Sequence, residues 1–400
     1  MKLPSLSRRQ FLATTTLIPL LPAALRAQQE IVIEGTARAE DVIPVALSGF
    51  TGVAQSVLRF DLEVVGFEIV PANSARYIIE GNNTASLIRG RVMNAASKQV
   101  LVNKGYSGTN ERRLAHALAN DIVRAIRNLP PIFHTRIAFR VETGRNTSEI
   151  YISDFDGHNP QRVTQDGKSV ASPCWVPGKQ ILYYSSYKDG WPVIYAHDLG
   201  AGSRTRVASY GGSNLSPAVS PDGRRVAMIL SKSGSPDLYL TAADGSGLTP
   251  LTRSRADESS PCWSPDGTQV CYVSRESGRP ALYVVPAGGG AARRLSTAGA
   301  ANPTEPSWSP DGKTIMFTSL MGDFLLCTIP AGGGEATILS QAGKRFTGED
   351  SSWAPNSRTV IFTRRAGNQR VLSLLDVPTK RVKDVARQIP GSYSQPSWSR

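Results

Sequence analysis

A short block built around tryptophan recurs through the second two-thirds of the chain, and this recurrence constrains the fold more than any other feature. The aromatic position of the block falls at residues 175, 219, 263, 308, 353 and 398, so the spacings are 44, 44, 45, 45 and 45 residues, with valine standing for tryptophan at 219. A tandem repeat of about 40–45 residues is typical of the four-stranded blades of a β-propeller. The period therefore predicts a propeller.

Each block is followed by residues that suit a tight hairpin turn, as in Ser-Pro-Asp-Gly at 264–267. Proline presets the backbone for the turn, and glycine supplies the positive φ that lets two antiparallel strands leave it. Runs of β-branched and aromatic residues come next, as at 269–274 and 314–318. A third such run, a Gly-rich turn and a polar edge strand complete a unit of four strands.

The number of strand sets predicts how the ring closes. Six sets of outer strands begin near residues 136, 180, 225, 269, 314 and 359, but the first set has no tryptophan block before it. The sixth block, at residues 395–400, has no strands after it, and pairing it with the first set leaves no open edge. We expect a mainly β fold, a six-bladed β-propeller over residues 134–400 closed by the C-terminal strand 395–400. Five tryptophans should be structural: Trp175, Trp263, Trp308, Trp353 and Trp398.

The first 27 residues are typical of an export signal. A basic start is followed by an apolar stretch and a small residue before a polar one, which indicates a secretory signal peptide. The run Ser7-Arg8-Arg9-Gln10-Phe11-Leu12 is also twin-arginine-like, so both export routes stay open. We expect the mature protein in the periplasm.

Residues 28–133 have a different texture from the repeats. Short β runs, one of them at residues 31–33, alternate with a possible helix at 55–64 and an amphipathic helix at 111–128 that two prolines stop. These residues predict a small α/β domain ahead of the propeller.

Charge and cysteine content bound the remaining possibilities. The formal charge is +13, and removing the four basic residues of the signal leaves 41 against 32, or +9. This surplus favours anionic surroundings.

No run of 18 apolar residues exists to span a bilayer, and the apolar fraction of 40% excludes a disordered chain. Cys262 and Cys271 could face each other on adjacent strands, but buried free thiols are the favoured interpretation.

The domain order and several local strings resemble the TolB family of the Tol-Pal system. The strings are Phe-His-Thr-Arg-Ile-Ala-Phe at 133–139, Ser-Asp-Phe-Asp-Gly at 153–157 and Ser-Lys-Ser-Gly-Ser-Pro-Asp-Leu-Tyr at 231–239. The resemblance covers essentially the whole mature chain, and it implies a periplasmic, non-catalytic binding scaffold. In this family the channel mouth binds the outer-membrane lipoprotein Pal, while the amino terminus and α/β domain communicate with inner-membrane Tol proteins.

The resemblance places partner binding in the loops that enter the innermost strands, because these loops ring the channel mouth. We expect no nucleic-acid partner, no transmembrane segment in the mature chain and a monomer. The residues expected to bind the partner are Ser213, Asn214, Asp257, Glu258, Ser260, Glu305 and Asp350.

No sequence motif indicates catalysis. Gly-x-Ser-x-Gly, His-Glu-x-x-His and Cys-x-x-Cys are all absent, and the sequence stops at the last block, so we expect no peptidase domain. We assign no catalytic residue, cofactor or metal, and expect His116 to be a packing or surface residue. One alternative is a propeller that binds a glycan or hydrolyses a small molecule through its channel. Carboxylates such as Asp257, Glu305 and Asp350 would also suit Ca²⁺.

Overall fold

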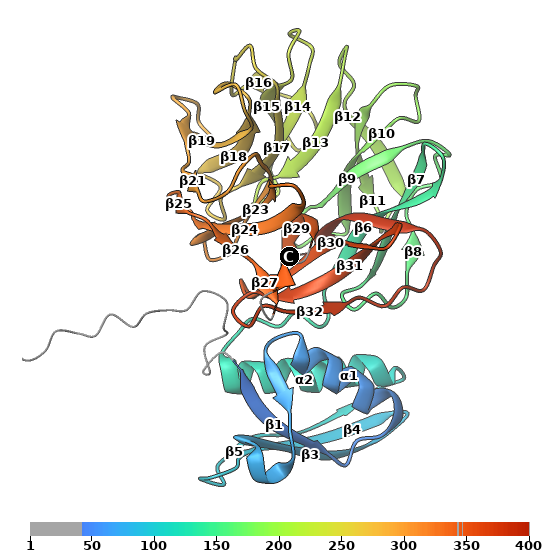
Figure 1. The fold of residues 1–400 in the computed structure, drawn as a ribbon. Coiled ribbons are helices and arrows are strands. Elements are labelled where there is room, and N and C mark those ends of the chain that lie inside the picture. The colour runs from blue at the N-terminus through green and yellow to red at the C-terminus, as the bar shows by residue number, and fades with distance from the viewer. Residues whose placement is uncertain (1–41, 342–343, 346, 400) are drawn as a thin grey trace, which may run out of the picture. The chain divides into compact units, whose positions relative to one another are not determined.

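The computed structural model describes residues 42–341, 344–345 and 347–399. Within them the chain forms a small α/β domain and a ring of β-sheets (Figure 1). The candidate signal peptide and the strand expected at 31–33 lie outside the described residues. No helix among the described residues is long and apolar enough to cross a membrane.

The α/β domain has one five-stranded sheet with both helices on one face (Figure 1). The sheet order is β2-β1-β3-β4-β5, with β1 parallel to β2 and β3 and the other pairs antiparallel. Its elements are β1 (Ile43–Ser48), α1 (Gly52–Glu63), β2 (Phe67–Ile69), the short 3₁₀ helix η2 (Ala72–Ser74), β3 (Tyr77–Thr84), β4 (Leu87–Asn94), β5 (Val100–Ser107) and α2 (Glu111–Arg127).

Helix α2 follows the expected pattern closely. The side chain of Asn110 caps its start by accepting a hydrogen bond from the Arg113 N–H at 3.0 Å. Asn128, with φ of 54°, ends it in the left-handed conformation. Leu118 and Ile122 on its apolar stripe are fully buried. Helix α1 begins three residues earlier than expected, and β2 was not expected because three residues carry too short a pattern to detect.

The remaining strands form six four-stranded blades, each with its first strand innermost. Blade 1 comprises β33 (Ser392–Trp398), β6 (Arg136–Gly144), β7 (Thr147–Asp154) and β8 (Gln161–Arg162). Blade 2 comprises β9 (Val170–Trp175), β10 (Ile181–Ser186), β11 (Val193–Asp198) and β12 (Ser203–Ala208). Blade 3 comprises β13 (Asn214–Val219), β14 (Arg225–Leu230), β15 (Asp237–Ala242) and β16 (Thr249–Pro250).

The other three blades have the same order. Blade 4 comprises β17 (Glu258–Trp263), β18 (Gln269–Ser274), β19 (Ala281–Pro286) and β20 (Arg293–Arg294). Blade 5 comprises β22 (Pro303–Trp308), β23 (Thr314–Leu320), β24 (Phe324–Pro330) and β26 (Thr337–Ile338). Blade 6 comprises β29 (Gly348–Trp353), β30 (Thr359–Ala366), β31 (Gln369–Asp376) and β32 (Arg381–Asp384). Two small pairs add β21 (Thr297–Ala298) with β25 (Gly334–Glu335), and β27 (Ser340–Gln341) with β28 (Lys344–Arg345).

Blade 1 combines strands from both ends of the propeller sequence. Strand β33 lies antiparallel to β6, with Ser392 opposite Glu142 and Trp398 opposite Ile137. The expected fold class, a six-bladed propeller with a small α/β domain, is therefore confirmed. The closing strand begins at Ser392, three residues before the expected start.

Tryptophans and cysteines pack between the blades. The five tryptophans at the block positions are 2–7% exposed. Three of them donate an indole N–H to a backbone carbonyl of the preceding blade: Trp175 to Ser397, Trp263 to Ala218 and Trp353 to Ser307. All four cysteines are free, although Cys262 lies directly opposite Cys271 in the β17–β18 pair. Cys271 and Cys327 are buried, as expected, whereas Cys174 and Cys262 are partly exposed.

Candidate functional site

The innermost strands of all six blades line a central channel with a cavity volume of about 310 Å³. One residue of each innermost strand takes a left-handed backbone conformation, with φ between 50° and 54°. These six residues, called the channel ring below, are Ser172, Ser216, Ser260, Glu305, Asp350 and Gln395.

Each ring residue sits where the register between the two innermost strands of its blade shifts. Such a bulge bends the strand and changes the direction of its side chains. Five ring residues precede a proline, which has no N–H to offer to the strand ladder. A left-handed conformation costs a non-glycine residue about 1 kcal/mol or more, and such strain concentrates at functional sites. The channel ring is therefore the first candidate site.

Hydrogen bonds join consecutive members of one half of the ring. The Asp350 N–H donates to Glu305 Oε2 at 2.9 Å, and the Gln395 N–H donates to Asp350 Oδ2 at 3.2 Å. The Ser172 N–H then donates to Gln395 Oε1 at 2.9 Å. Each long side chain thus anchors the backbone of the next blade. Serine, which is too short to repeat this contact, occupies the remaining positions.

The two ring carboxylates lie in one hydrogen-bonded chain without a basic partner. Thr318 and Thr363 donate their hydroxyls to Glu305 and Asp350 at 2.9 and 3.2 Å. Burial first, and then the charges of Glu305 and Glu349, raise the pKa of the Asp350 carboxyl well above its usual value. No ion pair joins a ring carboxylate to a described Lys, Arg or His. This half of the channel thus offers acceptor oxygens to an incoming donor or cation.

The structure separates the residues expected to bind a partner into two groups. Ser260, Glu305 and Asp350 line the channel. The other four, Ser213, Asn214, Asp257 and Glu258, are not among the residues that line it.

Two members of the second group have side chains committed to local structure. The fully buried Asn214 amide donates to the carbonyls of Tyr210 and Pro192 at 2.8 and 3.0 Å. Glu258 is 3% exposed and accepts from the Leu238 N–H at 2.9 Å and from the Thr252 hydroxyl.

Sequence reasoning missed Ser172, Ser216 and Gln395 as ring members. The signal was present, because every ring residue stands three positions before the aromatic position of its block. Serine occupies that position in three of the repeats, and Glu, Asp and Gln occupy it in the others. Because the residue types differ, the position is hard to recognise as equivalent from the sequence.

The loops that enter the innermost strands lie beside the hairpins that join the second and third strands. Backbone hydrogen bonds connect Tyr187 to Ser169 at 2.9 Å, Ser231 to Ser213 at 3.1 Å and Arg275 to Asp257 at 3.2 Å. Both sets of loops therefore lie at one end of the channel, which we call the mouth face. Exposed Asp257 belongs to it.

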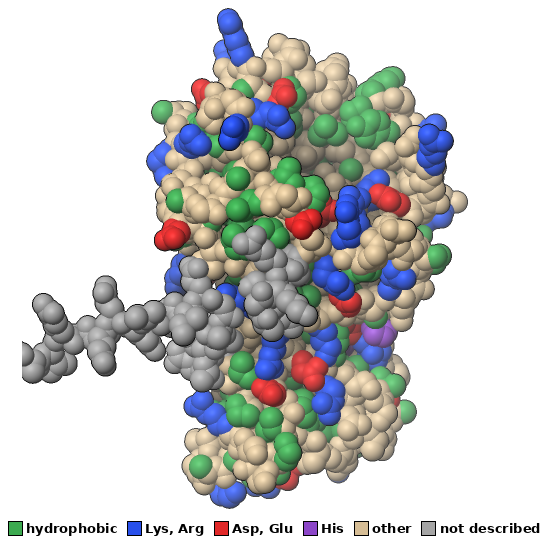
Figure 2. Space-filling model, viewed as in Figure 1, with side chains coloured by type: hydrophobic (Ala, Val, Ile, Leu, Met, Phe, Trp, Pro, Cys, Tyr) green, Lys and Arg blue, Asp and Glu red, His purple; other side chains and the backbone are tan. Residues whose placement is uncertain are grey.

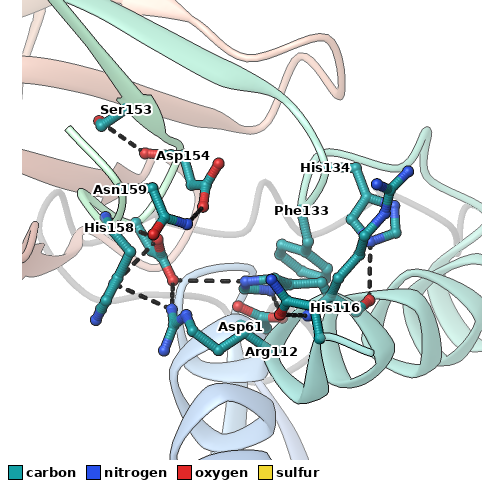
Figure 3. A network of polar contacts seen from close by, with 12 residues as sticks. Asp61, Arg112, His116, Phe133, His134, Ser153, Asp154, His158 and Asn159 are labelled. Atoms are coloured by element: carbon teal, nitrogen blue, oxygen red, sulfur yellow. Dashed lines mark hydrogen bonds and ion pairs between the residues drawn. The ribbon is translucent and has the colours of Figure 1, made fainter. Parts of the chain in front are cut away.

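A second polar cluster joins the α/β domain to blade 1 (Figure 3). This junction cluster consists of Asp61 on α1, Arg112 and His116 on α2, and Asp156 in the turn after β7. His116 Nδ1 lies 2.7 Å from Asp61 Oδ2, its Nε2 lies 3.6 Å from Asp156 Oδ2, and Arg112 forms an ion pair with Asp156. The side chain of Arg112 is 25% exposed and the other three are 0–5% exposed.

Burial governs the electrostatics of the junction cluster. It raises the pKa of Asp61 to about 6, against the opposing effects of His116 and Arg112. Burial also disfavours charged His116, but the charge and hydrogen bond of Asp61 outweigh it, so the His116 pKa is raised. His116 packs edge-on against Phe155 with ring centroids 5.5 Å apart. It is therefore both a packing residue, as expected, and part of a charged network.

Among the described residues, no group of three or more His, Cys, Asp and Glu side chains is placed to hold a metal ion. The fold and the channel define a closed six-bladed β-propeller with a polar central channel and a small α/β domain at its amino terminus. A family model described as the TolB β-propeller domain matches residues 125–400. The chain belongs to this family.

Known relatives match the chain over part of their length. A Tol-Pal system protein TolB from Bordetella avium is 31% identical over 217 residues, which are 46% of this chain and 48% of that protein. A protein of the same name from Desulfosudis oleivorans is 34% identical over 107 residues, or 26% of this chain and 24% of that protein. The matched stretches thus span between about a quarter and a half of these curated relatives.

A solved structure extends the likeness to both domains. The crystal structure of TolB from Acinetobacter baumannii superposes with a TM-score of 0.79, covering 92% of this chain and 98% of that one at 22% identity. At this identity the likeness shows the fold.

Proposed function

We propose that the chain is a non-catalytic periplasmic scaffold of a Tol-Pal system. Its channel mouth holds a Pal-like outer-membrane lipoprotein, and its α/β domain contacts inner-membrane Tol proteins. Membership of the TolB propeller family and relatives named as Tol-Pal system proteins support this proposal. They do not favour the alternative, a glycan-binding or hydrolytic propeller.

The observation that carries the proposal is the strained, uncompensated acidic half of the channel ring. Glu305 and Asp350 share one hydrogen-bonded chain, and their acceptor oxygens face a cavity large enough for side chains of a partner. Partly buried carboxylates that lie close together without a counter-charge are unfavourable in the free protein. A basic or hydrogen-bond-donating group from a partner would relieve this cost, so binding energy concentrates there.

The experiment is a calorimetric titration of the purified chain with the soluble domain of a Pal-like lipoprotein from the same organism. Glu305→Gln keeps the shape and an acceptor oxygen but removes the charge, and should weaken binding about tenfold, which corresponds to about 1.4 kcal/mol. Asp257→Lys, on the rim of the mouth face, should mainly slow association. Both variants should melt within a few degrees of the parent chain, because neither removes a packed apolar side chain.

Glu335→Lys provides the matched control, since Glu335 is an exposed carboxylate on β25, away from the channel. It should bind the lipoprotein domain as the parent does. Unchanged affinity in both Glu305→Gln and Asp257→Lys would move the binding site away from the channel and contradict the proposal.

A further inference from the structure

The exposed large apolar side chains of the propeller gather in two hairpins. Among the described residues of the propeller, they are Tyr187 and Trp191 between β10 and β11, and Leu320, Met321 and Phe324 around the turn between β23 and β24. Trp191 is 54% exposed and Phe324 is 39% exposed. Surface hydrophobic residues are usually scattered singly, so this clustering needs an explanation.

Both hairpins lie on the mouth face and on opposite sides of the channel. They join the second and third strands of blades 2 and 5, which in a closed ring of six are separated by two blades on either side. Tyr187 bonds to the loop entering blade 2, and Ser319 Oγ accepts from the Ala301 N–H at 3.1 Å in the loop entering blade 5. The apolar tips therefore flank the channel mouth.

The corresponding hairpins of the other four blades present exposed cations. The exposed basic residues at or beside the six hairpins are Arg145, Lys188, Lys232, Arg275, Arg279 and Arg365. Their exposed acidic counterparts are Glu276 and Asp323. Every hairpin of the mouth face thus presents either a large apolar side chain or a cation.

The turns at the other end of the channel have no such bias. Those that join the first and second strands of blades 2 to 5 expose three basic and three acidic side chains: Lys179, Arg224 and Lys313 against Asp222, Asp266 and Asp311. None of the exposed large apolar residues lies in these turns. Figure 2 shows Lys and Arg spread over the visible surface of the propeller with hydrophobic side chains exposed between them.

We propose that the mouth face docks on an anionic lipid bilayer, with the tips of the blade 2 and blade 5 hairpins inserted into the headgroup region. Tryptophan favours the membrane interface, because its ring is apolar and its N–H is polar. Basic residues are attracted to the negative surface of an anionic bilayer. Two separate apolar tips do not form the continuous apolar centre of a protein interface, whereas a flat surface meets all six hairpins at once.

This inference goes beyond the proposed function and does not depend on it. A mouth face that lies on a bilayer covers the channel mouth, so vesicles and the lipoprotein domain should compete for the chain. The test uses the fluorescence of Trp191, because the other five tryptophans are only 2–7% exposed. The full chain is mixed with vesicles of phosphatidylcholine and phosphatidylglycerol in equal amounts. Emission should shift to shorter wavelength and be quenched by brominated lipids, and both effects should disappear at high salt. Pure phosphatidylcholine vesicles should bind at least about tenfold more weakly.

A double variant tests the tips directly by vesicle co-sedimentation. The double variant Trp191→Ser, Phe324→Ser should reduce partitioning onto the vesicles about tenfold or more, since each substitution removes a large apolar side chain from one of the tips. Val53→Ser with Val100→Ser is the matched control, because these valines are 43% and 42% exposed on the α/β domain. The control should bind as the parent does. Glu305→Gln should also keep vesicle binding, which separates this test from that of the proposed function.

Three outcomes would overturn the proposal. The first is no partitioning onto anionic vesicles at low salt. The second is an equal loss in the valine control. The third is binding of an acidic protein domain through the same tips while vesicles are ignored, which would assign the surface to a protein partner.

Discussion

The junction cluster and the channel ring both bring two carboxylates together, but the groups that surround these carboxylates differ. At the junction, Asp61 and Asp156 contact His116 and Arg112, so basic groups stand beside the acids. In the ring, Glu305 and Asp350 accept hydrogen bonds from backbone N–H groups and threonine hydroxyls, and no described Lys, Arg or His forms an ion pair with them. Among the residues that the structure describes, one cluster has basic partners and the other has none.

This difference separates a structural role from a binding role. A buried carboxylate paired with a base holds two elements together, and losing its partner is strongly destabilising. A carboxylate left without a base at a cavity keeps its pairing capacity for something outside the protein. The comparison fits a structural role for the junction cluster and supports the binding role proposed for the ring.

Removing residues 395–400 should have the largest effect, because β33 serves both clusters. Gln395 belongs to the ring, while Trp398 donates to Thr135 Oγ1 at 2.7 Å and stacks on Phe155 beside the junction. The truncated chain should lose about 5 kcal/mol of unfolding free energy, as an inner strand and a buried tryptophan disappear together. Urea unfolding measures this loss.

Trp398→Phe is the milder companion to this truncation. It keeps the strand and the ring residue but removes the bond to Thr135, which should cost about 1–2 kcal/mol. A truncated chain that unfolds at the same urea concentration as the full chain would refute closure by β33.

The next largest effect should come from Arg112→Ala. It leaves Asp156 and Asp61 buried with only His116 and His158 as basic neighbours, so we expect a loss of about 3 kcal/mol in urea unfolding. Arg113→Ala, at the exposed neighbouring position, should change the unfolding free energy by less than about 0.5 kcal/mol. Equal effects of the two variants would mean that the junction cluster does not hold the domain.

A smaller predicted effect is a pH dependence of stability. The folded-state pKa of Asp61 is raised from 3.8 to about 6, so its contribution to stability is present below pH 3.8 and is lost as pH rises through 6. The pKa values of His116 and Asp350 are raised as well, so their contributions have the same sign. The unfolding free energy should fall by about 1 kcal/mol between pH 5 and pH 8 through Asp61 alone.

Two amide substitutions at pH 8 then distinguish the clusters. Asp350→Asn removes an uncompensated charge and should raise the unfolding free energy slightly, by less than about 1 kcal/mol. Asp61→Asn removes the charged partner of His116 and should not raise it. Stabilisation by both substitutions would show that the junction is no better compensated than the ring.

Much of the propeller was predictable because the sequence pattern of each blade is short and recurs in every repeat. Turn residues such as Pro265 and Gly267 recur at a fixed distance from each tryptophan, and strand-length apolar runs follow them. Strand β2 carries no such pattern, because three residues are too few. The junction cluster was also beyond sequence reasoning, since Asp61 and His116 are 55 positions apart and meet only when α1 packs on α2.

Three of the seven residues expected to bind a partner line the channel, but the sequence did not indicate where each of the seven side chains points. Asp257, Glu258 and Ser260 are close together in the sequence, yet Asp257 is exposed, Glu258 is buried and Ser260 lines the channel. Strand alternation and the bulge turn neighbouring side chains to different sides. Polarity alone does not reveal which side each one takes.

The pairing of β33 with β6 also determines the order in which the molecule can be completed during synthesis. The Arg136 N–H donates to the Ser399 hydroxyl, 263 positions further along the chain. Strand β6 leaves the ribosome long before this partner exists, so blade 1 stays incomplete while the other five blades are translated. Contacts between such distant segments form slowly, because the long intervening chain must first be brought together. We therefore expect ring closure to be a late step of folding, with the edge of β6 unpaired until β33 arrives.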